Sequence, residues 1–419
     1  MLFDPVLGSF FWGKTVSSIG IWIHNVVAAT VAYQVTGSAL IVGLVSVAQF
    51  GPQLALAPLS GKWSDQGNAA LQIILGRFVT AAGSAGMAVV LWAASGVDGL
   101  QDATWIIAFS VVVGIGFALG GPAMQSVVPL MIRPGEMAAA MTLNSVPMTL
   151  SRAIGPALGA LIVTHFDAVI AFVIASATNV AYAVCVMLLK LPRRALAAGS
   201  DGTIRGALRH TMADSRLLML LVGIAAVGFG IEPTMTLVPS LADELGGGPD
   251  LVGWLVSAFG VGSGIGFVLF TPLDRRLRID TLAVLGLVFI ALGLGVAGAS
   301  VWLSAPVVAL GGLAISGLGM TLAFSGITTQ IQDRVSDDLR GRVMALWFVA
   351  FLGARPLAAA STGYVADVVA IEAAFVAGGV IVGLVALLTG VRRPHPHRAG
   401  PVEPQDQAAL LLTRDARDV

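Results

Sequence analysis

Residues 13–33 read GKTVSSIGIWIHNVVAATVAY, an apolar stretch long enough to cross a bilayer as a single helix. His24 and Asn25 stand near its middle, where polar side chains are expensive and usually serve a function. The corresponding stretch of the second half contains VGFGIEP, in which Glu232 aligns with His24. One titratable side chain thus occupies the matching place in each half. This pattern indicates a two-fold transporter whose pathway runs between the halves.

The composition is that of a polytopic helical membrane protein. The chain has 419 residues, of which 57% are hydrophobic and 11% charged, and its mean hydropathy is +0.90. Apolar runs of about twenty residues recur along it, and backbone groups in lipid are satisfied only within helices or closed barrels. The single cysteine, Cys185, allows no intrachain disulfide. The N-terminus lacks the features of a cleavable signal peptide, so the first span is expected to remain in the protein.

The apolar runs predict twelve spans in two groups of six, separated by a polar and basic segment. The expected spans are 10–33, 38–60, 72–96, 104–128, 138–163, 168–190, 216–239, 250–272, 281–300, 305–328, 343–365 and 370–391. We expect an all-α protein with an N-terminal six-helix bundle (1–190), a cytoplasmic linker (191–215), a C-terminal six-helix bundle (216–391) and a cytoplasmic, mostly disordered tail (392–419).

Lysine and arginine predict the orientation in the membrane. With both termini in the cytoplasm, 20 of the 23 basic residues fall in inner segments and none falls in an outer loop. The outer loops carry acidic residues instead. This asymmetry predicts a multi-pass protein with both termini in the cytoplasm.

Arg152 and Arg355 lie inside spans five and eleven, about 20 Å along the helix axis from its start. Each stands shortly before a proline, and the two occupy the same place in each half. An internal repeat about an axis normal to the membrane explains such pairing and puts a substrate site near mid-depth between the halves. The two arginines are expected to bind an anionic substrate, to exchange acid partners during the cycle, or to brace helices.

Three segments resemble the major facilitator superfamily, and within it the branch of the enterobactin exporter and related drug-efflux proteins. They are SSIGIWIHNVVAATVAYQVTGSALIVGLVSVAQFGPQL (17–54), RPGEMAAAMTLNSVPMTLSRAIGPALGALIV (133–163) and DDLRGRVMALWFVAFLGARPLAA (337–359). The resemblance covers nearly the whole chain. It implies the major facilitator fold, with two pseudo-symmetric six-helix bundles and alternating access.

The resemblance also implies a conformational gate. The superfamily carries Gly-x-x-x-Asp-Arg-x-Gly-Arg between spans two and three, and GKWSDQGN (61–68) keeps the first glycine and the acid but lacks both arginines. In the family the acid anchors span two to the start of span eleven, where a carboxylate facing a helix N-terminus is favourable. Ordinary loop charges are the alternative. The implied gate residues are Gly61, Asp65, Gly67, Asp274, Arg275, Gly155, Pro156, Arg340 and Arg342.

Span five is similar to the pattern typical of antiporters, which ends in Gly-Pro-x-x-Gly-Gly. Residues 155–160 read GPALGA, whereas Thr142 and Ser151 stand where earlier glycines are expected. The Arg-x-x-x-Gly pattern of span four is absent. The resemblance therefore favours export and implies that any proton coupling uses charged groups elsewhere.

Glu232 and His24 are the predicted proton-coupling residues. Burial disfavours a charged carboxyl and a nearby cation favours it, so a carboxyl that alternates between the two environments takes up and releases a proton. Alternatively, Glu232 is a fixed partner of Arg152 or Arg355, or reaches outer water, and His24 is a packing residue. The residues expected to line or gate the substrate cavity are Asn25, Arg152, Arg355, Gln53, Gln125, Asn144, Trp22 and Phe229.

The sequence favours a secondary exporter of amphipathic small molecules, such as drugs or a siderophore, driven by protons across a bacterial cytoplasmic membrane. A facilitator or importer of a metabolite or lysolipid, and a non-transporting scaffold or sensor, are the alternatives. No phosphate-binding loop, metal cluster or nucleophile triad is evident, so neither enzyme activity nor a cofactor is expected. The expected partners are a small-molecule substrate, protons and the lipid bilayer, without nucleic acid, and the protein is expected to be a monomer.

Overall fold

The computed structural model describes residues 4–65, 69–128, 131, 137–189, 191, 214–335 and 337–391. These residues form thirteen α-helices and one short 3-10 helix, Val97–Gly99, without any strand among them. The helices are α1 (Leu7–Thr36), α2 (Ala39–Asp65), α3 (Ala69–Ala93), α4 (Thr104–Val127), α5 (Met137–His165), α6 (Ala168–Leu188), α8 (Ser215–Thr236), α9 (Val238–Glu244), α10 (Pro249–Asp274), α11 (Ile279–Trp302), α12 (Pro306–Arg334), α13 (Asp337–Val368) and α14 (Ile371–Val391). The predicted tail and most of the predicted linker lie outside the described residues.

The long helices coincide with the expected spans to within a few residues at most ends. Ten of the described helices are long and apolar enough to cross a membrane. Spans five and eleven correspond to α5 and α13, which have 29 and 32 residues. Span seven differs from its prediction, because α8 ends at Thr236 and the short helix α9 follows at the outer end. Pro239 stands in the first turn of α9, where a residue without a backbone N–H favours the start of a new helix.

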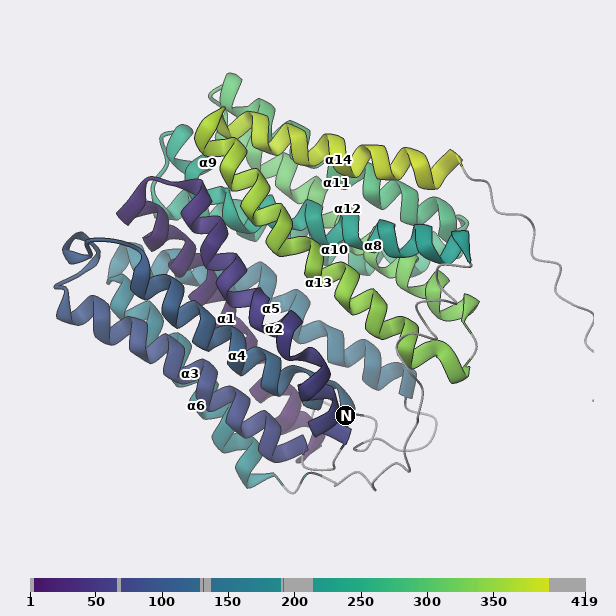
Figure 1. The fold of residues 1–419 in the computed structure, drawn as a ribbon, viewed down its shortest axis with the longest axis horizontal. Coiled ribbons are helices and arrows are strands. Elements are labelled where there is room, and N and C mark those ends of the chain that lie inside the picture. Colours follow the sequence, from purple (N-terminus) through teal and green to yellow (C-terminus); the bar gives the residue numbers. More distant parts are fainter. Residues whose placement is uncertain are drawn as a thin grey trace, which may run out of the picture.

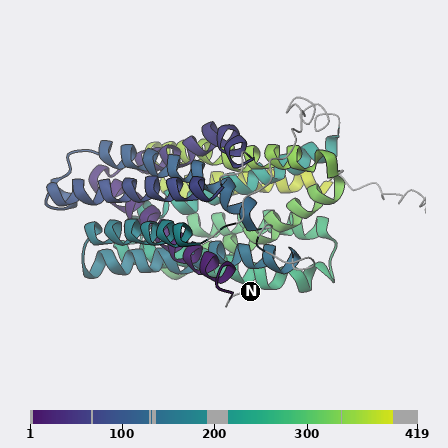
Figure 2. The ribbon, with the colours of Figure 1, turned by 90° about the horizontal axis from the view of Figure 1, so that it is seen from below.

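The helices pack in the same order in the two halves of the chain. In the first half α1 packs on α5, α2 on α4, and α3 on both α4 and α6. In the second half α8 packs on α13, α10 on α12, and α11 on both α12 and α14. Figures 1 and 2 show the long helices running side by side, with the first half in purple and blue and the second in green and yellow. This repeat confirms the predicted pair of pseudo-symmetric bundles.

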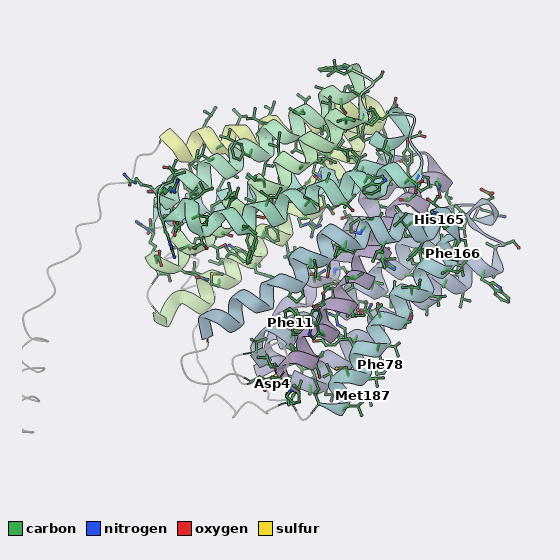
Figure 3. All side chains as sticks on the ribbon, turned by 180° about the vertical axis from the view of Figure 1, so that it is seen from behind. Asp4, Phe11, Phe78, His165, Phe166 and Met187 are labelled. Carbon is green, nitrogen blue, oxygen red and sulfur yellow. The ribbon has the colours of Figure 1, made fainter. Side chains whose placement is uncertain are left out.

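Apolar side chains cover the outside of the bundles, as a protein surrounded by lipid requires. Figure 3 shows the labelled side chains of Phe78 and Met187 pointing away from the bundle, and they are 39% and 59% exposed. Many leucines and valines of the long helices are exposed in the same way. The chain is therefore a multi-pass membrane protein.

The two halves meet along two helix pairs, α2 with α13 and α5 with α10. We name the end of the molecule where α1 ends and α2 begins the outer face, and the end where α1 begins the inner face, because the charge pattern predicts that the inner face lies in the cytoplasm. The pairs are related by the internal repeat, since α2 corresponds to α10 and α5 to α13. Each pair thus repeats the other around the centre of the molecule.

Carboxylates of the second half close the outer face by accepting hydrogen bonds from the first half. Asp367, in the last turn of α13, accepts a hydrogen bond from the backbone N–H of Ala39 at 2.7 Å, at the start of α2. A carboxylate at a helix N-terminus is favourable. On the other pair, Thr164 of α5 donates its hydroxyl hydrogen to Asp250 of α10 at 2.5 Å. The outer face is therefore closed in this structure.

Glycine lets α2 and α13 approach closely at the outer face. A Cβ atom on Gly43 of α2 would lie 2.5 Å from the carbonyl oxygen of Ala359 on α13. On the same helix, a Cβ atom on Gly51 would meet nothing within 4 Å. The closed outer face thus depends on the missing side chain at Gly43.

At the inner face, Asp214 fixes the start of α8 to the end of α12. Its carboxylate accepts hydrogen bonds from the backbone N–H groups of Arg216 and Leu217 at 3.0 and 3.2 Å, and pairs with Arg334 at 2.6 Å. Partial burial raises the pKa of the Asp214 carboxyl, but these hydrogen bonds and the charge of Arg334 outweigh it and hold that pKa below its ordinary value. The contact joins two helices of the second half.

Gly43→Val should shift the protein toward a form with an open outer face, because overpacking a helix contact costs about 1–3 kcal/mol. Such a cost corresponds to roughly a 5- to 150-fold change in population. Spin labels on Gln34 and Val369, both exposed at the outer face, report the distance between the halves in a Cys185→Ser background. Gly51→Val is the matched control and should leave the distance distribution unchanged. A Gly43→Val distribution identical to that of the parent would contradict this account of the closure.

Candidate functional site

One face of α2 carries side chains that contact three other helices. Ser46, Gln49, Phe50 and Gln53 follow the i, i+3, i+4, i+7 spacing that places residues on a single helix face. Gln49 donates a hydrogen bond from Nε2 to Oδ1 of Asn25 on α1, at 2.6 Å. The Nε2 atom of Gln53 is buried and has no hydrogen-bond partner. This face of α2 brings two of the predicted cavity residues, Asn25 and Gln53, into one region.

Glu232 lies where α8 meets both α13 and α2. Its side chain is 0% exposed, and its Oε2 atom pairs with Nε of Arg355 at 2.7 Å. Its other oxygen, Oε1, accepts a hydrogen bond from the hydroxyl of Ser46. The structure thus brings together two predicted residues of the second half, Glu232 and Arg355. Ser46, which was not predicted, joins them to the first half.

Arg355 also contacts the first half directly. Its guanidinium carbon lies 3.6 Å from the centre of the Phe50 ring, which is cation–π geometry. The arginine side chain is 11% exposed. We name Glu232, Arg355, Ser46 and Phe50 the Glu232 cluster. The two charges come from the C-terminal bundle, and their enclosing partners come from α2.

Close packing of α8 on α13 sets the geometry of the cluster. A Cβ atom on Gly228 would lie 2.2 Å from the carbonyl oxygen of Phe351, so only glycine permits this approach. Gly228 and Phe351 lie four residues, or one helical turn, before Glu232 and Arg355 respectively. The carboxylate and the guanidinium therefore meet one turn beyond the point of closest backbone approach.

Chemically, the Glu232 cluster is a buried ion pair whose hydrogen-bonding groups are completed across the two halves. Removing one partner of such a pair is strongly unfavourable, because the other charge stays buried without compensation. A proton on the carboxylate would remove its negative charge. Movement of α2 away from α8 and α13 would remove the contacts of Ser46 and Phe50. The contacts of both halves therefore converge on one carboxylate.

His24 is placed elsewhere, inside the N-terminal bundle. Its Nδ1 atom lies 3.1 Å from the hydroxyl of Ser84 on α3, and its ring packs edge-on against Phe172 of α6 at 5.1 Å. Its Nε2 atom is buried without a hydrogen-bond partner. The structure does not bring His24 to Glu232, although the sequence aligns the two.

The predicted antiporter-like segment of α5 lies between α1 and α10. A Cβ atom on Gly155 would lie 2.5 Å from Cβ of Trp22, which is buried on α1. The carbonyl oxygen of Pro156 lies 3.2 Å from the Cβ position of Gly253 on α10. Trp22 is thus part of the α1–α5 contact, and Pro156 is part of the contact between the halves.

Several other predicted residues are described only in part. Phe229 is partly buried on α8, and Asp274 and Arg275 are exposed at the inner end of α10. The structure does not describe the surroundings of seven other predicted cavity and gate residues, namely Gly61, Asp65, Gln125, Asn144, Arg152, Arg340 and Arg342. Gly67 lies outside the described residues altogether.

Arg77 is a buried cation on α3 that was not among the predicted site residues. It is 2% exposed on α3, and its Nη1 atom donates to the hydroxyl of Ser17 at 3.3 Å and to Oδ1 of Asn179 at 3.2 Å. Its Nε and Nη2 atoms have no hydrogen-bond partner, and its guanidinium lies 5.2 Å from the centre of the Phe117 ring. Arg77 therefore joins α1, α3, α4 and α6 within one bundle.

An aromatic cluster lies beside the Glu232 cluster and was also not predicted. Trp347 and Phe351 of α13 stack with ring centres 5.8 Å apart, and Phe324 of α12 meets both rings edge-on at 5.1 and 5.3 Å. The indole Nε1 atom of Trp347 is buried without a hydrogen-bond partner. Phe351 precedes Arg355 by one turn, so apolar rings and the ion pair are neighbours along α13.

Comparisons with solved structures agree with this architecture. A bacterial homologue of the human lysosomal transporter Spinster, in an inward-facing and unoccupied conformation, is 16% identical with a TM-score of 0.73 over 92% of this chain and 95% of that chain. A peptide transporter, POT, in complex with sulfate is 16% identical with a TM-score of 0.71 over 92% and 93%. A POT family transporter in complex with 5-aminolevulinic acid is 11% identical with a TM-score of 0.72 over 92% and 95%. Identities this low support the fold alone.

The sequence itself matches one family model over nearly its whole length. That model is described as a transmembrane secretion effector and matches residues 3–409. No curated protein matches the sequence. The chain therefore belongs to the transmembrane secretion effector family of the major facilitator superfamily, whose members are transporters rather than enzymes.

Proposed function

We propose that this transporter is a proton-coupled exporter of amphipathic small molecules, such as drugs or a siderophore. It works by alternating access, as a monomer in a bacterial cytoplasmic membrane with both termini in the cytoplasm. The observation that carries the proposal is the enclosed ion pair of Glu232 and Arg355, which the first half completes through Ser46 and Phe50.

The Glu232 cluster supplies a physical route for coupling. With the outer face closed, the hydroxyl of Ser46 donates a hydrogen bond to the Glu232 carboxylate and Arg355 pairs with it. Opening the outer face separates Ser46 from Glu232 and admits water from outside. A proton taken up there weakens the ion pair and so opposes reclosure. Proton binding and outer opening are therefore linked through one equilibrium, in which each promotes the other.

The closed state then directs the proton inward. Reclosure restores the contacts of Ser46 and Arg355 with the Glu232 carboxylate, and in this cycle the proton leaves at that step. The outer face is shut at that stage, which leaves the inner side as the outlet. Substrate that enters from the inner side moves in the opposite sense, and the cycle is that of an antiporter. His24, enclosed by α3 and α6, is assigned to packing in this proposal.

Two observations favour export as the direction. The family description is that of a secretion effector, and the Gly155-Pro156 segment, which resembles antiporters, contributes to the contact between the halves. The aromatic cluster of Trp347, Phe351 and Phe324, next to the polar face of α2, suits a substrate with apolar and polar parts. Asp65 and Asp274 are proposed to stabilise the outward-open form at the inner face.

Glu232→Gln should abolish proton-driven uptake of ethidium into inverted vesicles while ethidium binding remains, because the amide keeps the shape but takes up no proton. Vesicle fluorescence with an imposed pH gradient measures the uptake of ethidium. A titration of the purified protein with ethidium measures its binding. Glu244→Gln, at an exposed acid on α9, is the control and should transport like the parent.

Unchanged proton-driven uptake in Glu232→Gln would rule out the coupling role of this residue. Counterflow in the parent protein at equal rates with and without a pH gradient would identify a facilitator instead of a proton-coupled exporter.

Arg355→Gln should lower the free energy of unfolding by about 3–5 kcal/mol, because it leaves the Glu232 carboxylate buried without a cation. The double variant Glu232→Gln/Arg355→Gln should recover most of that loss, since two neutral amides replace the pair. Thermal unfolding of the purified protein in detergent measures both. Arg276→Gln, at an exposed arginine, should have little effect. Equal destabilisation of the single and double variants would show that the ion pair does not carry this energy.

A further inference from the structure

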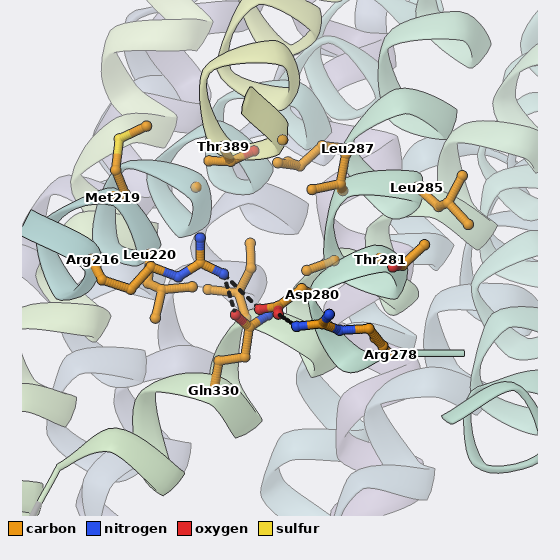
Figure 4. A pocket seen from close by; sticks show the side chains of 15 residues that line it. Arg216, Met219, Leu220, Arg278, Asp280, Thr281, Leu285, Leu287, Gln330 and Thr389 are labelled. Carbon is orange, nitrogen blue, oxygen red and sulfur yellow. Dashed lines mark hydrogen bonds and ion pairs between the residues drawn. The ribbon is translucent and has the colours of Figure 1, made fainter. Parts of the chain in front are cut away.

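A pocket lies inside the C-terminal bundle near the inner face, apart from the contacts between the halves (Figure 4). Its volume is about 310 Å³, and it is lined by residues of α8, α11, α12 and α14. On α8 the lining extends from Arg216 to Gly223, a rise of about 10 Å at 1.5 Å per residue. The pocket is therefore deep enough to hold a segment of hydrocarbon chain.

The walls of the pocket are apolar. Leu220, Leu287 and Ile327 line it from three different helices, and all three are buried. Gly223 and Gly390 contribute no side chains, which keeps the space between α8 and α14 empty of protein atoms. Such walls suit methylene groups, whose burial is favourable in proportion to the apolar area covered.

Positive charge gathers at the mouth. Arg216 donates from Nη2 to Oδ1 of Asp280 at 2.6 Å and to Gln330 at 3.0 Å, while Nη2 of Arg278 lies 3.4 Å from the other oxygen of Asp280. Figure 4 shows these contacts as dashed lines. Two arginines thus share one carboxylate, which leaves one positive charge in excess. The Arg278 side chain is 73% exposed, so its guanidinium is accessible to a ligand at the mouth.

The rim of the pocket joins the lipid-facing surface. Thr281 on α11 and Gly390 on α14 line the pocket and are exposed. On α14, Gly390 is preceded by Leu387 and Leu388, which are 65% and 59% exposed in a membrane-spanning helix. A lipid at the inner face can therefore reach the pocket sideways from the bilayer.

We propose that this pocket binds an anionic phospholipid from the leaflet at the inner face. The phosphate lies at Arg278, and part of one acyl chain lies between Leu220, Leu287 and Ile327. Basic pockets between membrane helices on the cytoplasmic side suit anionic headgroups, and an arginine guanidinium matches the geometry of a phosphate. The excess charge at the mouth selects an anionic headgroup, and the apolar walls select a lipid over a free anion.

The site is independent of the transport pathway proposed above. Its lining residues all belong to one bundle, and none lies on α2 or α5, where the halves meet. A bound lipid would stabilise the packing of α8 against α11 and α14 without closing the outer face. Its test therefore needs no transport measurement.

Native mass spectrometry of the delipidated full-length protein measures the affinity for dioleoyl phosphatidylglycerol and for dioleoyl phosphatidylcholine. We expect the parent to bind the anionic lipid about fivefold more tightly, as one arginine near a membrane surface provides. Arg278→Gln should remove this preference. Arg276→Gln, an exposed arginine of the same loop that does not line the pocket, should keep it.

A second variant tests the apolar part of the pocket. A Cβ atom on Gly390 would meet only Val284, at 3.7 Å, so Gly390→Leu fits and fills the pocket. Gly390→Leu should weaken the binding of both lipids. Three outcomes would overturn the proposal. They are equal affinity of the parent for the two lipids, a loss of preference in Arg276→Gln as large as that in Arg278→Gln, and unchanged lipid binding in Gly390→Leu. Displacement of the lipid by millimolar inorganic phosphate would assign the mouth to a free anion and overturn it as well.

Discussion

A carboxylate and a guanidinium, Glu232 and Arg355, meet inside the membrane, and residues of both halves surround them. Burying an ion pair is unfavourable unless further contacts satisfy both groups. Ser46 and Phe50 supply those contacts from the opposite half of the molecule. At the outer face, too, carboxylates of the second half accept hydrogen bonds from the first half. These carboxylates belong to Asp243, Asp250 and Asp367. At the outer face, neutral donors of one bundle thus meet carboxylates of the other.

The fold makes this closure possible through its internal repeat and its small residues. Since α2 corresponds to α10 and α5 to α13, the two pairs that join the halves are related by the internal repeat. Close approach at Gly43 on α2 and at Gly228 on α8 brings backbones together without intervening side chains. The pocket at the inner face is lined by residues of one bundle alone.

The long helices and the pairing of the halves could be predicted from the sequence, because lipid requires long apolar runs. The short helix α9 was not predicted. The ion pair was one of the predicted alternatives, since few charges stand inside spans. Ser46 and Phe50 were not predicted, although their spacing with Gln49 and Gln53 places all four on one face of α2. The rotation of a helix about its axis is set by its neighbours and is not evident in a uniformly apolar span. For the same reason the alignment of His24 with Glu232 does not hold in space, because Gly20 packs on α6 whereas Gly228 packs on α13.

In the proposed mechanism, the charge of Glu232 and the closure of the outer face are linked. The most direct test is the distance between spin labels at Gln34 and Val369, measured from high to low pH in the Cys185→Ser protein and in the same protein with Glu232→Gln. Because the exposed acids Asp243, Asp250 and Asp367 also contact the first half, the difference between the two proteins isolates the buried carboxyl. Low pH is expected to populate the longer distance in the parent and to have a much smaller effect in Glu232→Gln. Identical pH dependence in the two proteins would contradict it.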